Sequence, residues 1–94
     1  MIVRIMGEGQ FDLPPESLKL LDELDDHLLG AVRQGDEADF RATLSALLAA
    51  ARQSGRALPP ESLESSELVL PAEDATLDEV REMLSEDGLI AEGG

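Results

Sequence analysis

The chain of 94 residues contains no cysteine, no tryptophan and no tyrosine, and it has only one histidine. Without cysteine neither a disulfide nor a thiolate metal site can form, and small secreted domains usually need such cross-links. The longest apolar runs are a few residues, far short of the roughly 20 residues of a membrane-spanning helix. The N-terminus also lacks the basic and apolar regions of a signal peptide. We therefore expect a soluble cytoplasmic protein.

Aromatic residues are nearly absent, since Phe11 and Phe40 are the only two. The hydrophobic core must therefore be built from Leu, Ile, Val, Met and Ala. The length favours a single domain spanning residues 1–94. A domain of this size buries roughly two-thirds of the surface of its unfolded chain, which leaves little material for a catalytic cleft.

Basic residues are scarce: seven Lys and Arg against 21 Asp and Glu give a net charge of −14. The acidity is concentrated in residues 57–94, which contain one basic and eleven acidic residues. Nucleic acids and anionic lipid surfaces bind to basic patches, so direct binding to either is disfavoured. An acidic surface attracts a cationic partner surface, although on many proteins it serves solubility alone.

The N-terminal residues predict a β-hairpin over residues 2–13. Gly7-Glu8-Gly9 separates two apolar segments, and its glycines allow positive φ in a tight turn. Side chains alternate along the first strand, so Val3 and Ile5 share the face that we expect to pack on helices. The other face carries the remaining three residues of the strand, Ile2, Arg4 and Met6.

Two helices are predicted over residues 15–34 and 37–54. Pro14-Pro15 can begin the first helix, because proline is tolerated in a first turn. Its apolar stripe passes through Leu18, Leu21, Leu24 or Asp25, Leu28 and Val32, and its acids gather around the opposite side: Asp22, Glu23, Asp25 and Asp26.

The second helix has the cleanest amphipathic pattern of the chain. Gly35 is a natural C-cap for the first helix and Asp36 is a good N-cap for the second. Such a short break predicts an antiparallel pair of helices. The apolar positions of the second helix recur at helical spacing, at Phe40, Leu44, Leu47, Leu48 and Ala51.

The remaining residues predict a linker over 56–67, a short strand over 68–70 and a helix over 77–87. Thr76 and Glu79 form a capping box at the start of this helix, and Gly88 stops it. The predicted fold class is α+β. A small antiparallel sheet, made of the N-terminal hairpin and the short third strand, packs on an αα-hairpin and a C-terminal helix.

No sequence motif predicts catalysis, a cofactor or a metal site. His27 is best interpreted as a surface histidine, because the second histidine of a zinc motif is absent. Gly7-Glu8-Gly9 joins two strands, whereas a phosphate-binding loop leads into a helix. Glu73-Asp74, beside Asp78 and Glu79, are interpreted as acids that favour a helix N-terminus, with weak cation binding as the open alternative. We expect a protein that is not an enzyme.

The sequence resembles the PspA-associated (PspAA) family along nearly its whole length. The opening Met1-Ile-Val-Arg-Ile-Met-Gly-Glu-Gly-Gln-Phe11 carries much of this resemblance. It continues through five further segments in the same order, at residues 24–26, 36–41, 66–71, 74–80 and 88–90. The resemblance implies a small accessory protein of phage-shock protein A (PspA), a coiled-coil protein that binds and remodels membrane under envelope stress. It implies no catalytic residues.

Two surfaces are candidates for partner binding. The first is the outward face of the hairpin, at Ile2, Arg4 and Met6, whose edge could also pair with a second copy to give a homodimer. The second is the acidic last third, which would attract a cationic or amphipathic helix of PspA, at Glu73, Asp74, Asp78 and Glu82. Membrane would then be reached only through the partner. Two alternatives stay open: an acidic inhibitor or mimic that fills a basic groove of another protein, and a structural homodimer scaffold.

Overall fold

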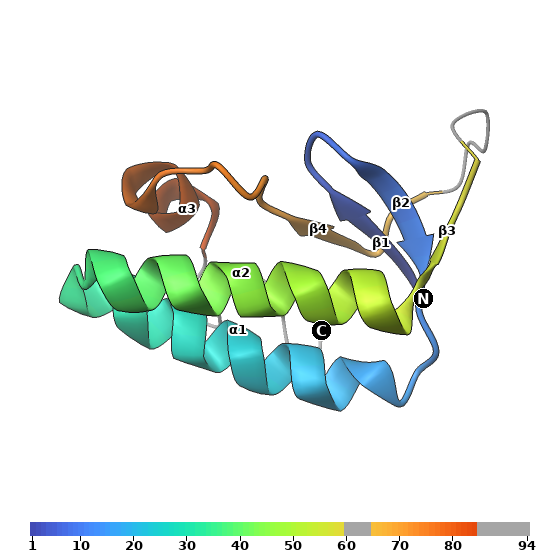
Figure 1. Cartoon of the computed structure of the whole chain (residues 1–94), viewed down its shortest axis with the longest axis horizontal. Coiled ribbons are helices and arrows are strands. Elements are labelled where there is room, and N and C mark those ends of the chain that lie inside the picture. Colours follow the sequence, from blue (N-terminus) through green and yellow to red (C-terminus); the bar gives the residue numbers. More distant parts are fainter. Residues whose placement is uncertain (60–64, 85–94) are drawn as a thin grey trace.

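The computed structural model describes residues 1–59 and 65–84. Two long antiparallel helices lie along one side of a small sheet (Figure 1). The sheet lies over the C-terminal half of the second helix, and a short third helix lies over its N-terminal half. This is the predicted α+β fold. The elements in chain order are β1 (Ile2–Ile5), β2 (Gly9–Asp12), α1 (Ser17–Gln34), α2 (Glu37–Ser54), β3 (Arg56–Ala57), β4 (Leu68–Leu70) and α3 (Leu77–Met83).

The sheet is mixed, with strand order β3-β2-β1-β4, so the prediction of an antiparallel sheet was wrong in part. The hairpin strands β1 and β2 are antiparallel, as expected, but β4 runs parallel to β1, with Val3 opposite Leu68. Parallel neighbours require a long crossover connection, and here the chain passes through both long helices between β1 and β4. The sequence of a three-residue strand holds no sign of its direction.

A fourth strand lies inside the segment that we predicted to be a linker. Arg56 and Ala57 form β3, which pairs antiparallel with Asp12 and Phe11 of β2. Both residues are exposed, so no apolar pattern marks this strand. Its backbone pairing with β2 is what makes it a strand.

The hairpin forms as its sequence predicts. Val3 and Ile5 are fully buried beneath the helices, and Arg4 and Met6 face outward. Gly7 and Gly9 have φ values of 85° and 126°, a region that side chains rarely adopt. The two glycines are therefore needed to form the turn.

Helix α1 differs from its predicted face at two positions. It begins at Ser17 and not at residue 15, after a turn in which the Ser17 N–H donates to the Pro14 carbonyl at 3.0 Å. Leu18, predicted to be in the apolar stripe, is 38% exposed. Asp25, predicted both as an alternative to Leu24 in the stripe and among the exterior acids, is fully buried. Asp25 lies four residues after Leu21 and three before Leu28, so the helical period places it on the buried side.

The caps and the core of α2 agree with the sequence. Gly35 is left-handed, with φ 69°, and the Asp36 side chain accepts a hydrogen bond from the Asp39 N–H at 3.1 Å. The apolar stripe of α2 is buried at all five predicted positions, at Phe40, Leu44, Leu47, Leu48 and Ala51.

Helix α3 has the predicted capping box between Thr76 and Glu79, but it ends earlier than predicted. Leu84 is extended, with φ −76° and ψ 136°, so the helix stops at Met83 and not at residue 87. Leu77 and Val80 are buried. The predicted stop at Gly88 lies outside the described residues.

Candidate interaction surface

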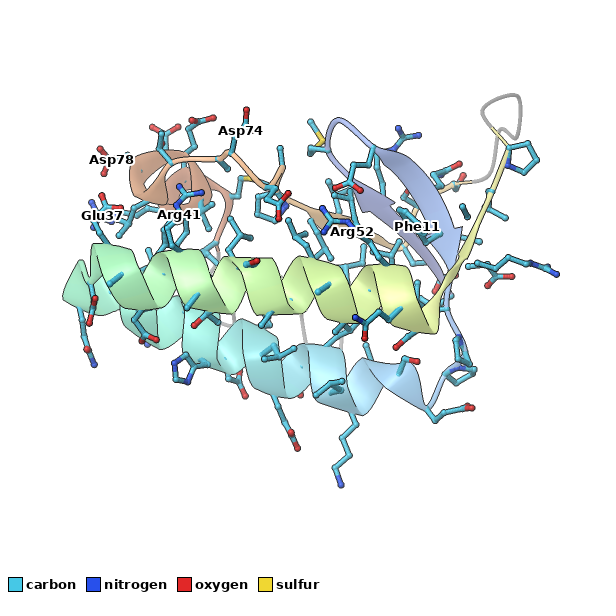
Figure 2. The ribbon with its side chains drawn as sticks, in the orientation of Figure 1. Phe11, Glu37, Arg41, Arg52, Asp74 and Asp78 are labelled. Atoms are coloured by element: carbon cyan, nitrogen blue, oxygen red, sulfur yellow. The ribbon has the colours of Figure 1, made fainter. Side chains whose placement is uncertain are left out.

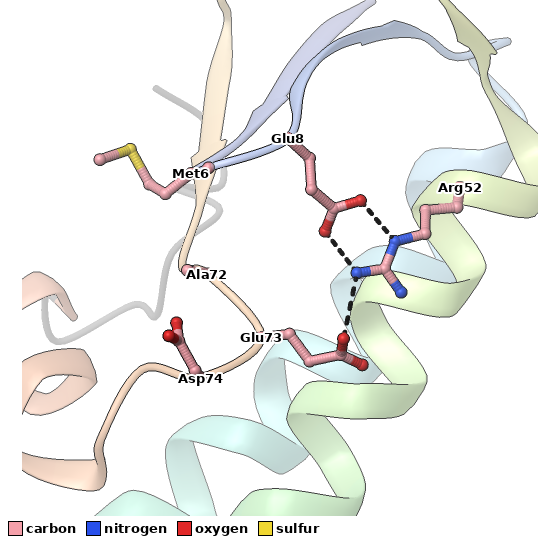
Figure 3. A pocket seen from close by; sticks show the side chains of 7 residues that line it. Met6, Glu8, Arg52, Ala72, Glu73 and Asp74 are labelled. Carbon is pink, nitrogen blue, oxygen red and sulfur yellow. Dashed lines mark hydrogen bonds and ion pairs between the residues drawn. The ribbon is translucent and has the colours of Figure 1, made fainter.

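The parallel pairing of β1 and β4 brings two loops together. The Met6 N–H donates to the Leu70 carbonyl at 3.0 Å, so the two strands end side by side. The hairpin turn that follows β1 therefore lies next to the loop that follows β4. Between them is an open pocket of about 550 Å³, shown in Figure 3 and lined by Met6, Gly7, Glu8, Arg52, Ala72, Glu73 and Asp74.

Arg52 of α2 ties the two loops to the helix. Its Nε donates to Glu8 Oε1 at 2.8 Å and its Nη2 donates to Glu8 Oε2, a two-pronged contact (Figure 3). The same Nη2 lies 3.7 Å from a carboxylate oxygen of Glu73 in the opposite loop. The hydrogen bond from Arg52 holds the pKa of Glu8 below its usual value, against the effect of burial. We call these three residues the Glu8–Arg52–Glu73 clasp.

Arg41 holds the same loop further along α2. Its Nη1 donates to the Glu73 carbonyl at 2.8 Å, and its Nη2 donates to the Ala75 carbonyl. The guanidinium lies 4.9 Å from the centre of the Phe40 ring, a cation–π distance. Arg41 and Arg52 are eleven residues apart, about three helical turns, so they project from one side of α2 toward the loop (Figure 2).

Some acidic residues of the last third have partners within the chain, and others do not. Glu79 serves in the capping box, and Asp78 pairs with Arg81 at 3.2 Å. Within the described part of the chain, Asp74 and Glu82 show neither an ion pair nor a side-chain hydrogen bond, and both are exposed. We name the acidic end of the molecule by its exposed residues, Glu37, Glu73, Asp74, Asp78 and Glu82; Figure 2 shows Glu37, Asp74 and Asp78 at this end.

The structure joins the two predicted surfaces at one place only. Met6 of the hairpin lines the same pocket as Glu73 and Asp74. Ile2 and Arg4 lie on the outer face of β1, away from this pocket, while Asp78 and Glu82 lie on α3. Met6 is 48% exposed, so it adds apolar surface to the pocket.

The prediction that the edge of the hairpin pairs with a second copy was wrong. Strand β1 has β2 on one side and β4 on the other, and β2 is covered by β3. Both edges of the hairpin are therefore occupied within the chain. The edges of this sheet are instead β3 and β4.

Residues 1–59 and 65–84 contain no group of three His, Asp or Glu side chains that lie close enough together to hold a metal ion. His27 is exposed, as predicted, and its Nε2 lies 3.0 Å from Asp39 Oδ1 on the neighbouring helix. In the same part of the chain no helix has the length and apolar character needed to cross a membrane.

Sequence reasoning missed the two arginines that shape the surface. The sequence patterns assign Glu8 only to the hairpin turn and give Arg41 and Arg52 no partner. The partners of Arg41 and Arg52 lie 21 to 44 positions away in the chain, so local patterns could not pair them. The one available signal was that Arg41 and Arg52 interrupt the alanine-rich exterior of α2 on the same side.

Comparison with known proteins gives one match. Neither the curated proteins nor the solved structures gave a match to the chain. Residues 1–92 of the 94 match the PspAA family, described as PspA-Associated protein. The match covers all of the described fold, including the hairpin, the clasp and the acidic end. The chain therefore belongs to the PspA-associated protein family.

Proposed function

We propose that this protein is a non-enzymatic adaptor that associates with PspA and regulates it in the bacterial response to envelope stress. The observation that carries the proposal is the family match over residues 1–92. The partner, as the resemblance implies, is a coiled-coil protein that remodels membrane. The adaptor is then cytoplasmic and reaches the inner face of the membrane through its partner.

The acidic end supports an electrostatic contact with a basic or amphipathic helix of PspA. Asp74 and Glu82 are exposed and have no internal partner in the described part of the chain. Met6 adds apolar surface beside Asp74 in the same pocket. Opposite charges across an interface raise the association rate and select the partner.

A role without catalysis agrees with the chemistry of the surface. The pocket has no histidine and no nucleophilic serine, threonine or cysteine among its lining residues. Its one cation, Arg52, is paired with Glu8 and Glu73. A catalytic pair of acid and base would need titratable groups that are free to exchange protons with a substrate.

The test is co-purification of PspA with this protein across a salt series. Between roughly 0.1 M and 1 M salt the Debye length falls from about 10 Å to about 3 Å, so an electrostatic contact weakens. The double variant Asp74→Asn/Glu82→Gln should weaken binding, because it removes two charges of the acidic end that serve no described internal contact. A matched control is Asp22→Asn/Glu67→Gln, which removes the same charges elsewhere and should leave binding unchanged.

Two other functions are less well supported. An acidic mimic should present its carboxylates as a free array, whereas here Glu8, Asp36, Asp78 and Glu79 serve ion pairs or helix caps. A homodimer scaffold would need another interface than the hairpin edge, which is occupied. Light scattering that shows a stable dimer of the isolated protein, together with no retention of PspA, would favour the scaffold.

A further inference from the structure

The two long helices leave an apolar groove between them, separate from the acidic end. Its volume is about 300 Å³. Leu20 is 47% exposed there, although leucine is among the residues most often buried. The groove is lined by Leu20, Glu23, Leu24 and His27 of α1 and by Ala42, Thr43 and Ala46 of α2.

The shape of the groove suits a third helix. Leu20 and Leu24 are four residues apart on α1, and Ala42 and Ala46 are four apart on α2, so each pair lines one wall. Alanine side chains let a neighbouring helix approach closely, within the 8–10 Å between axes that packed helices adopt. At one end the groove is closed by His27 and Asp39, whose side chains meet across the two helices at 3.0 Å.

Charge decides which occupant fits. Exposed charged residues border the α1 side of the groove. They are the three acids Glu16, Glu23 and Asp26 and one lysine, Lys19. The α2 side is bordered by uncharged residues, Ser45, Ala49 and Gln53. A second copy would bring an acidic border against an acidic border, and each chain has a net charge of −14. A partner with basic residues along one flank is complementary.

We propose that the groove between α1 and α2 binds an amphipathic helix of the partner. This helix has a Leu, Ile or Met stripe that enters the groove and Lys or Arg residues along the flank that faces α1. The inference deepens the proposed function and rests on it, because the helix is assigned to PspA. Helix-in-groove binding of this kind is read from anchors at positions i, i+3, i+4 and i+7 of the guest helix.

The test uses paired variants with PspA as the probe. Leu20→Asn removes an apolar anchor, and Leu18→Asn is its control. Leu18 is also exposed, at 38%, but it lies about 200° from Leu20 around the axis of α1. Ala46→Arg fills the groove, and Ala57→Arg is its control, because Ala57 is also an exposed alanine but lies on β3, outside the groove. Calorimetry should show the affinity lowered at least about tenfold by Leu20→Asn and Ala46→Arg, about 1.4 kcal/mol, and nearly unchanged by both controls.

A second probe separates the groove from the proposed function. It is a synthetic amphipathic helix with a leucine stripe and lysines along one flank, added to the ¹⁵N-labelled full chain. Amide shifts should centre on Leu20, Leu24, Ala42 and Ala46, and the same peptide with glutamates in place of lysines should bind more weakly. Peptide binding without PspA binding would refute the assignment to PspA and retain the groove.

Three results would overturn the groove itself. One is that PspA binds with equal affinity to the wild type, Leu20→Asn and Ala46→Arg. Another is that the peptide binds a chain ending at residue 84 but not the full chain, which would assign the groove to residues 85–94. The third is a concentration-dependent dimer that Leu20→Asn abolishes, which would assign it to a second copy.

Discussion

Replacing Gly55 by alanine should destabilise the fold, because three elements meet at this residue. A Cβ atom there would lie 2.6 Å from Leu13 Cδ1, 2.9 Å from the Ala51 carbonyl oxygen and 3.0 Å from Phe11 Cβ. Favourable contacts between carbon atoms lie at about 3.5–4.0 Å. Leu13 is 1% exposed and cannot move without displacing its neighbours. Gly55→Ala should therefore lower the free energy of unfolding by about 1–3 kcal/mol, the cost of overpacking a core.

The matched control is Gly30→Ala in the middle of α1. A Cβ at Gly30 meets nothing within 4 Å, and alanine in a helix is more favourable than glycine by about 0.5–1 kcal/mol. The same chemical change should thus stabilise the protein at Gly30 and destabilise it at Gly55. Urea unfolding followed by circular dichroism measures both. Equal stability of the two variants, or a more stable Gly55→Ala, would refute the packing at this junction.

Three further predictions concern the contacts that shape the acidic end. Arg52 lowers the pKa of Glu8 in the folded state, so the pair stabilises the fold above the ordinary Glu pKa, and this stabilisation is lost as the pH falls through the lower folded value. The difference in free energy of unfolding between wild type and Arg52→Met should therefore vanish in acid. A difference that stays constant with pH would contradict this. Arg41→Met should cost about 1–2 kcal/mol and speed amide exchange in the loop before α3, with the exposed Arg4→Met as a comparison. Unchanged exchange would argue against the Arg41 contacts. Thr76→Ala removes the cap of α3 and should cost about 1 kcal/mol, whereas Thr76→Ser should retain most of the stability.

Local sequence patterns predicted the parts of the fold that depend on near neighbours. The glycines at positions 7 and 9 indicate the turn because it requires positive φ. The capping box of α3 is visible because Thr76 and Glu79 are three residues apart. The apolar stripe of α2 repeats with the period of the helix that it forms. In each case the sequence signal and the structure that it forms lie close together in the sequence.

What the sequence did not predict depends on distant parts of the chain. The direction of β4 follows from the route of the chain through both helices. β3 exists because its backbone meets Phe11 and Asp12, about 45 residues earlier. Asp25 was predicted both as an alternative to Leu24 in the apolar stripe and among the exterior acids, and the packing around α1 decides between the two by burying it.

The candidate surface was predicted only in part, for the same reason. The acids near α3 could be located from charge alone, but their sorting into caps, ion pairs and free carboxylates required coordinates. The clasp joins a turn, a helix and a loop that are adjacent only because β1 and β4 are parallel. Glu8 and Arg52 therefore could not be recognised as partners from the sequence.

The most direct test of the central claim is the affinity of the purified full chain for purified PspA, measured by calorimetry at low and at high salt. We expect a stoichiometric complex whose affinity falls as salt rises. The affinity should fall further in Asp74→Asn/Glu82→Gln but not in Asp22→Asn/Glu67→Gln. The absence of any complex at low salt would contradict the assignment of PspA as the partner. A complex that neither salt nor the acidic-end variant weakens would contradict the electrostatic contact.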